Sequence, residues 1–160
     1  MWVVLFVVLL DIIGFGIVLP IFPFFAERLG ASPEMVMLYI AIYMAAAFFS
    51  APVMGMLSDT YGRKPIMIIS LFGATLGYVI LAYSTALWMI VIARIFSGLM
   101  AGSFSAAQAY ITDSTTEENR PKYMGYFGGA MALGYVIGPA IGSYFGGETF
   151  AQASFKEPAL

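Results

Sequence analysis

The sequence has no cysteine and no histidine, and only 10% of its 160 residues are charged. Without cysteine there is no disulfide or thiol chemistry, and without histidine there is no imidazole base. The same two absences remove the common soft metal sites, so we expect neither a cofactor nor a bound metal. The net charge of −2 is too small to indicate nucleic acid as a partner.

Apolar residues make up 61% of the chain, which leaves too few polar side chains to cover a surface that faces water. A soluble domain carries about 25% charged residues, more than twice the share found here. The chain is therefore expected to lie in a membrane, with lipid as its surroundings.

Five segments are long and apolar enough to cross a membrane, because a spanning helix needs about 20 mainly apolar residues. They cover residues 1–25, 34–57, 65–83, 86–110 and 123–146. The sequence thus predicts an all-α membrane protein in which residues 1–147 form one bundle of transmembrane helices. Residues 148–160 are expected to be an extracytoplasmic tail that leads to a sixth helix absent from the chain.

The basic residues predict how the bundle is oriented in the membrane. Four of them lie in connections on one side and two on the other: Arg63, Lys64, Arg120 and Lys122 against Arg28 and Lys156. Because cytoplasmic connections carry an excess of lysine and arginine, the amino terminus is predicted to be cytoplasmic.

Only two charged residues lie deep inside a predicted span, Asp11 in the first and Arg94 in the fourth. From the helical rise, Asp11 lies roughly 15 Å from the inner end of its helix and Arg94 roughly 12 Å from the outer end. Both are then near the middle of a hydrocarbon core about 30 Å thick. Since intramembrane charges are costly and usually functional, we expect a direct or water-bridged pair, or a shared hydrated cavity. A buried pair that only fixes the helix register is the alternative.

Small residues follow Arg94 at steps of four, namely Gly98, Gly102 and Ala106. This spacing lets another helix approach closely, so Arg94 is expected on a packed or cavity-lining face. Gln108 and the hydroxyl groups of Ser103 and Ser105 add polarity further along the segment. We take Gln108 and Ser105 as candidates for lining a cavity, although hydrogen bonding between helices would explain them equally well.

A second group of charges lies at the ends of the predicted helices. Asp59 and Asp113 come at carboxyl ends and Arg63 at an amino end, so each has the wrong sign for its helix dipole. We expect Arg63 to pair with Asp113 across the cytoplasmic face, and Asp59 to face a helix amino terminus outside this chain. Such pairs would latch one conformation; the alternative is that the basic residues only anchor the topology and bind anionic lipid.

The fifth segment carries a ridge of small residues at every fourth position: Ala130, Gly134, Gly138, Gly142 and Gly146. Pro139 lies within this ridge and removes the donor to the carbonyl group four residues earlier. We therefore expect a closely packed helix with a kink, as a gate requires.

These clusters together resemble the amino-terminal half of a major facilitator superfamily transporter, and more closely the drug/proton antiporters of the tetracycline-efflux type. The first segment is similar to the pattern D-x-x-G-x-G-x-x-x-P-x-x-P, carried by Asp11, Gly14, Gly16, Pro20 and Pro23. GMLSDTYGRKP, residues 55–65, resembles the loop signature G-x-L-[AS]-D-[RK]-x-G-R-[RK], with Thr60 where a basic residue is usual.

Two further motifs carry the same resemblance. IARIFSGLMAG, residues 92–102, is similar to a fourth-helix motif built around an arginine, with Ser97 and Met100 where glutamine and glycine are common. Residues 125–143 resemble the fifth-helix signature of antiporters, with Ser143 in place of its final glycine.

The resemblance implies twelve helices in two halves around a central cavity that opens alternately to either side, of which this chain supplies five. It implies a proton-coupled antiporter that exports small amphipathic compounds or drugs, with Asp11 as the proton-coupling or substrate acid and Arg94 as its tuning group. The implied conformational positions are Gly55, Gly62, Gly134, Gly138, Pro139 and Gly142. The implied partners are lipid, protons, a small-molecule substrate and the remaining carboxy-terminal helices, in a bacterial inner membrane.

Other functions stay open from the sequence. A metabolite or sugar carrier of the same superfamily is one alternative, and a non-transporting fragment that needs a partner half is another. An intramembrane aspartyl protease would need two deep aspartates, and only Asp11 is deep, so we do not expect an enzyme. The aromatic and methionine residues permit large amphipathic substrates without choosing among them.

Overall fold

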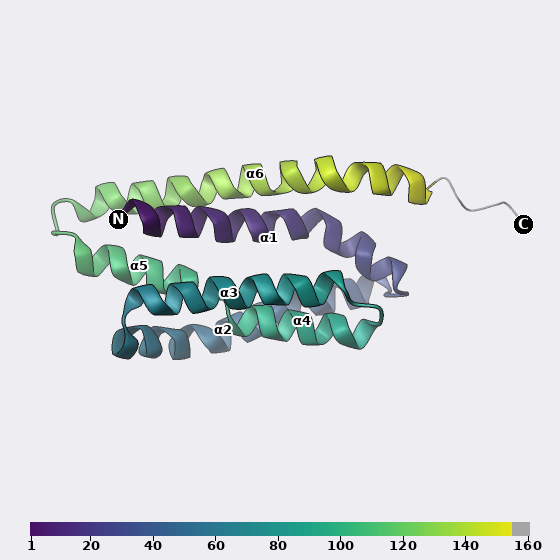
Figure 1. Cartoon of the computed structure of the whole chain (residues 1–160), viewed down its shortest axis with the longest axis horizontal. Helices are drawn as coiled ribbons and strands as arrows, with labels where there is room; N and C mark the ends of the chain where they lie inside the picture. The colour runs from purple at the N-terminus through teal and green to yellow at the C-terminus, as the bar shows by residue number, and fades with distance from the viewer. Residues whose placement is uncertain (155–160) are drawn as a thin grey trace, which may run out of the picture.

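The computed structural model describes the backbone of residues 1–154 and the side chains of residues 1–144. This part of the chain forms α1 (Trp2–Arg28), α2 (Pro33–Tyr61), α3 (Arg63–Ala82), α4 (Leu87–Leu99), α5 (Ser103–Ser114) and α6 (Arg120–Ser154). The helices run along the long axis of the molecule in a single bundle (Figure 1). The expected all-α fold is therefore confirmed.

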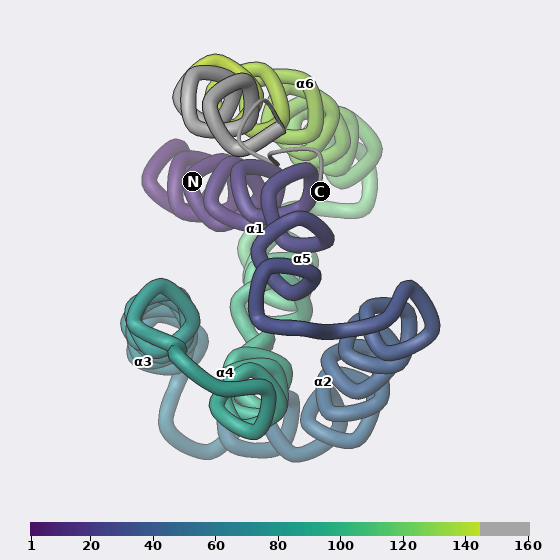
Figure 2. Tube along the Cα trace, turned by 90° about the vertical axis from the view of Figure 1, so that its right-hand side faces the viewer, coloured from purple at the N-terminus to yellow at the C-terminus, as the bar shows by residue number. Residues whose placement is uncertain are grey.

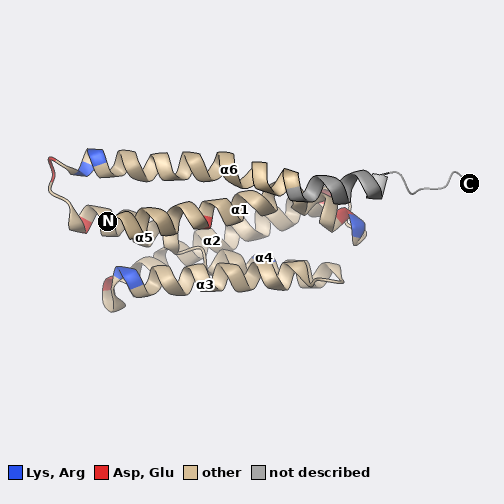
Figure 3. Cartoon of the chain, turned by 45° about the horizontal axis from the view of Figure 1, so that its top comes forward, with Lys and Arg blue, Asp and Glu red and all other residues tan. Residues whose placement is uncertain are grey.

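The outside of the bundle is apolar enough to lie in lipid. Helices α1, α2, α3 and α6, and α4 together with α5, are each long and apolar enough to cross a membrane. Phe48, Phe49 and Phe72 are more than 70% exposed, which suits contact with acyl chains and not with water. Charged residues gather at the two ends of the bundle (Figure 3). The protein is an integral membrane protein.

The fourth predicted span differs from the expectation, because it is not one continuous helix. Residues 86–110 were expected to form a single span, but Met100–Gly102 separate α4 from α5. Glycine at positions 98 and 102 weakens the helix locally. Contacts with α1 and α2 stabilise the break, and hydropathy along the chain cannot predict contacts between helices.

The ends of the helices follow local sequence signals. The side chain of Ser32 accepts a hydrogen bond from the backbone N–H of Met35, and Pro33 occupies the first turn of α2. At the carboxyl end of the chain, α6 continues to Ser154. It therefore enters the stretch 148–160 that was expected to be a tail; residues 155–160 lie outside the described part.

The helices pack in two layers joined by α5. Helix α1 lies along α6, and α4 packs against both α2 and α3. Viewed along the bundle, α5 lies between the pair α1 and α6 and the group α2, α3 and α4 (Figure 2). The chain of the fourth span thus passes from the lower layer toward α1, which brings its middle close to the middle of the first span.

Two apolar clusters fill the ends of the bundle. One includes Val8, Met54, Ile66, Ile111 and Phe127. The other includes Phe22, Val36, Tyr39, Leu81 and Ile90. Along α1, α2 and α3 the residues between these clusters lie near mid-span, and this is where the candidate site is found.

Candidate functional site

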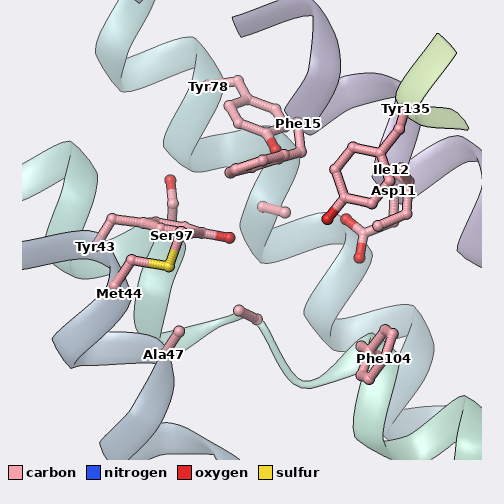
Figure 4. A pocket seen from close by; sticks show the side chains of 12 residues that line it. Asp11, Ile12, Phe15, Tyr43, Met44, Ala47, Tyr78, Ser97, Phe104 and Tyr135 are labelled. Atoms are coloured by element: carbon pink, nitrogen blue, oxygen red, sulfur yellow. The ribbon is translucent and has the colours of Figure 1, made fainter. Parts of the chain in front are cut away.

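A cavity of about 220 Å³ lies between the two apolar clusters, and every helix contributes to its wall. Its lining is mostly aromatic and small apolar, with one carboxylate (Figure 4). The lining residues are Asp11, Ile12, Phe15, Tyr43, Met44, Ala47, Ala74, Tyr78, Ser97, Ala101, Phe104 and Tyr135. A carboxylate in this position can bind a proton or a polar group of a ligand, since it is half-buried and faces the cavity.

The carboxylate of Asp11 has one hydrogen-bond donor from another helix. The hydroxyl group of Ser103 donates to Oδ2 of Asp11. Ser103 is buried and is the first residue of α5, so the acid also lies at the amino end of that helix. The helix dipole favours a negative charge at this end. The hydroxyl donor and the helix end thus favour the ionised form of the acid, whereas its burial opposes that form.

The break in the fourth span puts Ser103 in this position. In a continuous helix the carbonyl group of Leu99 would accept a bond from the N–H of Ser103. Instead, the hydroxyl group of Ser50 on α2 donates to the carbonyl oxygen of Leu99. The N–H of Gly102 turns back to the carbonyl oxygen of Met100, at 2.8 Å. A buried side chain of another helix thus replaces a lost backbone hydrogen bond.

Arg94 lies on α4 and is only 6% exposed. Its guanidinium carbon lies 3.7 Å from the centroid of the Phe22 ring, which is a close cation–π contact. The Nε–H group is buried and has no hydrogen-bond partner in the described part of the chain. Arg94 lines a second cavity of about 40 Å³ together with Phe22, Val18 and other apolar residues.

Asp11 and Arg94 do not form a direct ion pair in the described part of the chain. The two side chains line adjoining cavities instead of one chamber. Phe15, Tyr43 and Met44 belong to both walls. The phenol group of Tyr43 interacts electrostatically with both charges. Of the arrangements expected from the sequence, the direct pair is absent, and the two side chains do not line the same cavity.

Three tyrosines line the cavity together with the acid, and none of them is among the candidate residues expected from the sequence. Tyr43, Tyr78 and Tyr135 come from α2, α3 and α6, and all line the same cavity as Asp11. A signal was available, because a tyrosine near mid-span must place its hydroxyl group in polar surroundings away from the membrane interface. That signal identifies candidates but not the helices that bring them together.

The two cavity candidates from the fourth span lie elsewhere. The hydroxyl group of Ser105 donates to the carbonyl oxygen of Gly102, 3.1 Å away, within its own helix end. Gln108 is exposed on the outside of the described bundle. Neither belongs to the cavity wall, whereas Ser97 and the Asp11 partner Ser103 are at the site.

Residues 4–155 match the family described as Major Facilitator Superfamily. The chain belongs to the major facilitator superfamily. It is 36% identical over 147 residues to the "Tetracycline resistance protein, class H" of Pasteurella multocida, which covers 90% of this chain and 37% of that protein. It is 35% identical over 161 residues to the class B protein of Escherichia coli, which covers 99% of this chain and 40% of that protein.

A more distant relative is the "Multidrug resistance protein 2" of Bacillus subtilis, at 29% identity over 149 residues. That match covers 92% of this chain and 37% of the relative. The chain therefore spans about two fifths of the length of the curated relatives it matches. The family expected from the sequence motifs is confirmed.

A second polar network of this major facilitator chain lies where α2, α3 and α5 meet at one end of the bundle. Arg63 pairs with Asp113 (Nε to Oδ2, 3.0 Å) and with Asp59 (Nη1 to Oδ1, 2.5 Å). Its Nη1 also donates to the hydroxyl group of Ser58 at 2.6 Å. The Arg63–Asp113 pair expected from the sequence is present. Asp59 was expected to face a helix end outside this chain, but its partner is Arg63.

The glycines expected to be conformational fall into separate groups. Gly134, Gly138 and Gly142 face α1, where an added Cβ atom would meet Ile12, Gly16 and Ile17 respectively. Pro139 also lies at this interface, next to Gly16, and α6 continues through it. Gly62 has a φ of +96°, and Gly55 has no neighbouring atom within 4 Å of an added Cβ. Close packing thus explains the ridge, and backbone conformation explains Gly62.

Proposed function

We propose that this chain forms the amino-terminal part of a proton-coupled antiporter that exports small amphipathic drugs, tetracyclines among them, by alternating access. The observation that carries this proposal is the position of Asp11. It is the one carboxylate in the wall of a mid-membrane cavity to which every described helix contributes. An ionisable group at this depth is costly, so it is typical of a proton or substrate pathway.

The walls of the cavity suit an amphipathic substrate. Aromatic rings such as Phe15 and Phe104 offer flat apolar contact, and phenol groups such as those of Tyr43 and Tyr78 offer hydrogen bonds. A compound with an apolar body and several polar groups would satisfy both kinds of wall. The names of the relatives, tetracycline and multidrug resistance proteins, support a drug as the substrate.

The surroundings of Asp11 support proton exchange. Burial disfavours the ionised carboxylate, whereas the hydrogen bond from the Ser103 hydroxyl group favours it. These effects oppose one another, so a modest rearrangement of α1 and α5 would change whether the acid holds its proton. Binding and release of a proton would in this way be tied to the direction in which the cavity opens.

The proposed orientation places the amino terminus in the cytoplasm of a bacterial cell, with the chain in the inner membrane. Arg63, Lys64, Arg120 and Lys122 lie at the end of the bundle that holds the Arg63–Asp113 pair. This end would be cytoplasmic by the positive-inside rule. The proposed partners are lipid, protons, the drug and the further helices that complete the length of the relatives. We propose no enzymatic activity.

Transport by the intact protein in everted membrane vesicles tests the proposal. Addition of tetracycline to vesicles with a preformed pH gradient is expected to release protons, and Asp11→Asn is expected to abolish this release. Glu34→Gln is the matched control, since Glu34 is an exposed acid at the start of α2. Full proton release by the Asp11→Asn variant would refute the role of Asp11. Proton release on addition of a sugar, but not on addition of any of several drugs, would refute the substrate class.

A further inference from the structure

The contact between Ser103 and Asp11 joins two features that the proposed function leaves separate, the acid of the first span and the break in the fourth. Ser103 is 2% exposed, and its hydroxyl group donates to the carboxylate. Its backbone N–H would bond the carbonyl group of Leu99 if α4 and α5 were continuous. That carbonyl group is held by Ser50 instead. The side chain of Ser103 therefore contacts Asp11, while its backbone lies at the break between α4 and α5.

The strength of this contact depends on the protonation of the acid. A hydroxyl group that donates to an ionised carboxylate forms a charge-assisted hydrogen bond, about twice as strong as a neutral one. When Asp11 binds a proton, the contact loses this charge assistance. The force that keeps Ser103 turned toward α1 then falls, while the N–H group of Ser103, which has no hydrogen-bond partner in the described part of the chain, stays available to Leu99.

Other groups around Asp11 do not offer the same link. Tyr43 of α2, Tyr78 of α3 and Tyr135 of α6 line the same cavity as Asp11, and Arg94 of α4 lines the adjoining one. In general a phenol is neutral and a guanidinium is charged near pH 7. From α5 the group that reaches Asp11 is the hydroxyl group of Ser103. Asp11 is therefore the group whose charge changes, and the hydrogen bond from Ser103 is the contact whose strength changes with that charge.

We propose that Ser103 is a positioning residue that couples the protonation of Asp11 to the shape of the fourth span. With Asp11 ionised, Ser103 stays on the carboxylate and the break between α4 and α5 is kept. With Asp11 protonated, the N–H of Ser103 bonds the carbonyl group of Leu99, Ser50 is displaced, and α4 and α5 join. The inference rests on the proposed function, in which Asp11 carries the coupled proton.

The test is an infrared pH titration of the Asp11 carboxyl group in the purified intact protein. Its carbonyl band is assigned by subtracting the spectrum of Asp11→Asn. Ser103→Ala is expected to move the midpoint of this titration upward by about one pH unit, because the ionised carboxylate loses a donor. Ser103→Thr keeps the hydroxyl group and is expected to restore the original midpoint. Thr112→Val on the same helix is the control, since Thr112 bonds only the carbonyl oxygen of Gln108 at 3.0 Å.

The coupling to the break has its own variant. Ser50→Ala leaves the carbonyl group of Leu99 without its donor, which favours the bond from the N–H of Ser103 and draws the hydroxyl group away from Asp11. Ser50→Ala is therefore expected to move the midpoint upward as well, and the double variant Ser50→Ala, Ser103→Ala is expected to move it no further. Additive shifts, or no shift from Ser50→Ala, would overturn the coupling.

The outcomes separate this inference from the proposed function. If Asp11→Asn abolishes drug-driven proton release but Ser103→Ala leaves the midpoint unchanged, the inference fails and the proposed function stands. If Asp11→Asn retains proton release, the proposed function fails whatever the titration shows. If Ser103→Ala does not fold, the shift expected from Ser50→Ala still decides the inference.

Discussion

Gly138 of α6 and Gly16 of α1 face each other where the two helices pack, and neither position has room for a side chain. A Cβ atom on Gly138 would lie 2.7 Å from the Cα atom of Gly16, and one on Gly16 would lie 3.0 Å from the Cα atom of Gly138. Rotation of a side chain cannot relieve contacts between two backbones. The packing of the first and last described helices therefore requires glycine at both positions.

Gly138→Ala is expected to destabilise the protein by about 1–3 kcal/mol, the usual cost of overpacking a close interface. Gly128→Ala on the same helix is the matched control, because a Cβ atom on Gly128 would meet no atom within 4 Å. Both changes gain helix propensity, so their difference reports the steric clash. Thermal unfolding in detergent measures it. Equal melting temperatures for the two variants would show that α1 and α6 do not approach as described.

The Arg63–Asp113 pair is expected to contribute a coupling free energy of at most about 1 kcal/mol, because both side chains are partly exposed. A double-mutant cycle of Arg63→Gln and Asp113→Asn, followed by thermal unfolding, measures this coupling. It should weaken with added salt, as the Debye length falls from about 10 Å at 0.1 M to about 3 Å at 1 M.

Lys64→Gln is the control for this cycle, since it removes a positive charge at the next position. Lys64 lies over the ring of Tyr110, at 5.9 Å from its centroid, and has no described ion pair with Asp113. A cycle of Lys64→Gln and Asp113→Asn should show a smaller coupling. A coupling free energy as large as that of Arg63 would mean that the overall positive charge at this end of the bundle, and not the observed ion pair, produces the coupling.

Gly62→Ala is expected to destabilise the protein by about 1–2 kcal/mol, because the φ of +96° is strained for a residue with a Cβ atom. Gly55→Ala lies six residues before the end of α2, where an added Cβ atom meets open space. It should instead stabilise the helix by up to about 1 kcal/mol. Melting temperatures that move in opposite directions are the expected result; a shift of the same sign would argue against the described turn.

The contact of Arg94 with Phe22 is expected to be worth about 2 kcal/mol, since the guanidinium is desolvated and lies 3.7 Å from the ring centroid. A double-mutant cycle of Phe22→Leu and Arg94→Met measures this coupling by thermal unfolding. Phe25→Leu in the same cycle is the control, because Phe25 packs in the same apolar cluster without a described contact to Arg94. Similar couplings for both phenylalanines would remove the case for a specific cation–π contact.

Much of the fold could be predicted because hydropathy and charge are properties of the chain in one dimension. The apolar runs located the first three spans to within four residues, as for 65–83 and α3 (Arg63–Ala82), whereas α6 continues past its expected end at residue 146 to Ser154. The Arg63–Asp113 pair could also be anticipated, since each charge has an unfavourable interaction with the dipole of its own helix end and a partner of opposite sign compensates it. The family followed from motifs spread over several helices, and residues 4–155 match it.

What the sequence by itself determined is that the chain spans a membrane, where its apolar spans lie, and that Asp11 and Arg94 are inside two of them. Only the tertiary structure decided their partners: Ser103 for the acid and the ring of Phe22 for the guanidinium. It also decided the break at Met100–Gly102, because Ser50 from another helix completes the hydrogen bonding there. These contacts join residues far apart in the chain, and periodicity along one helix does not specify which neighbour will supply the missing donor.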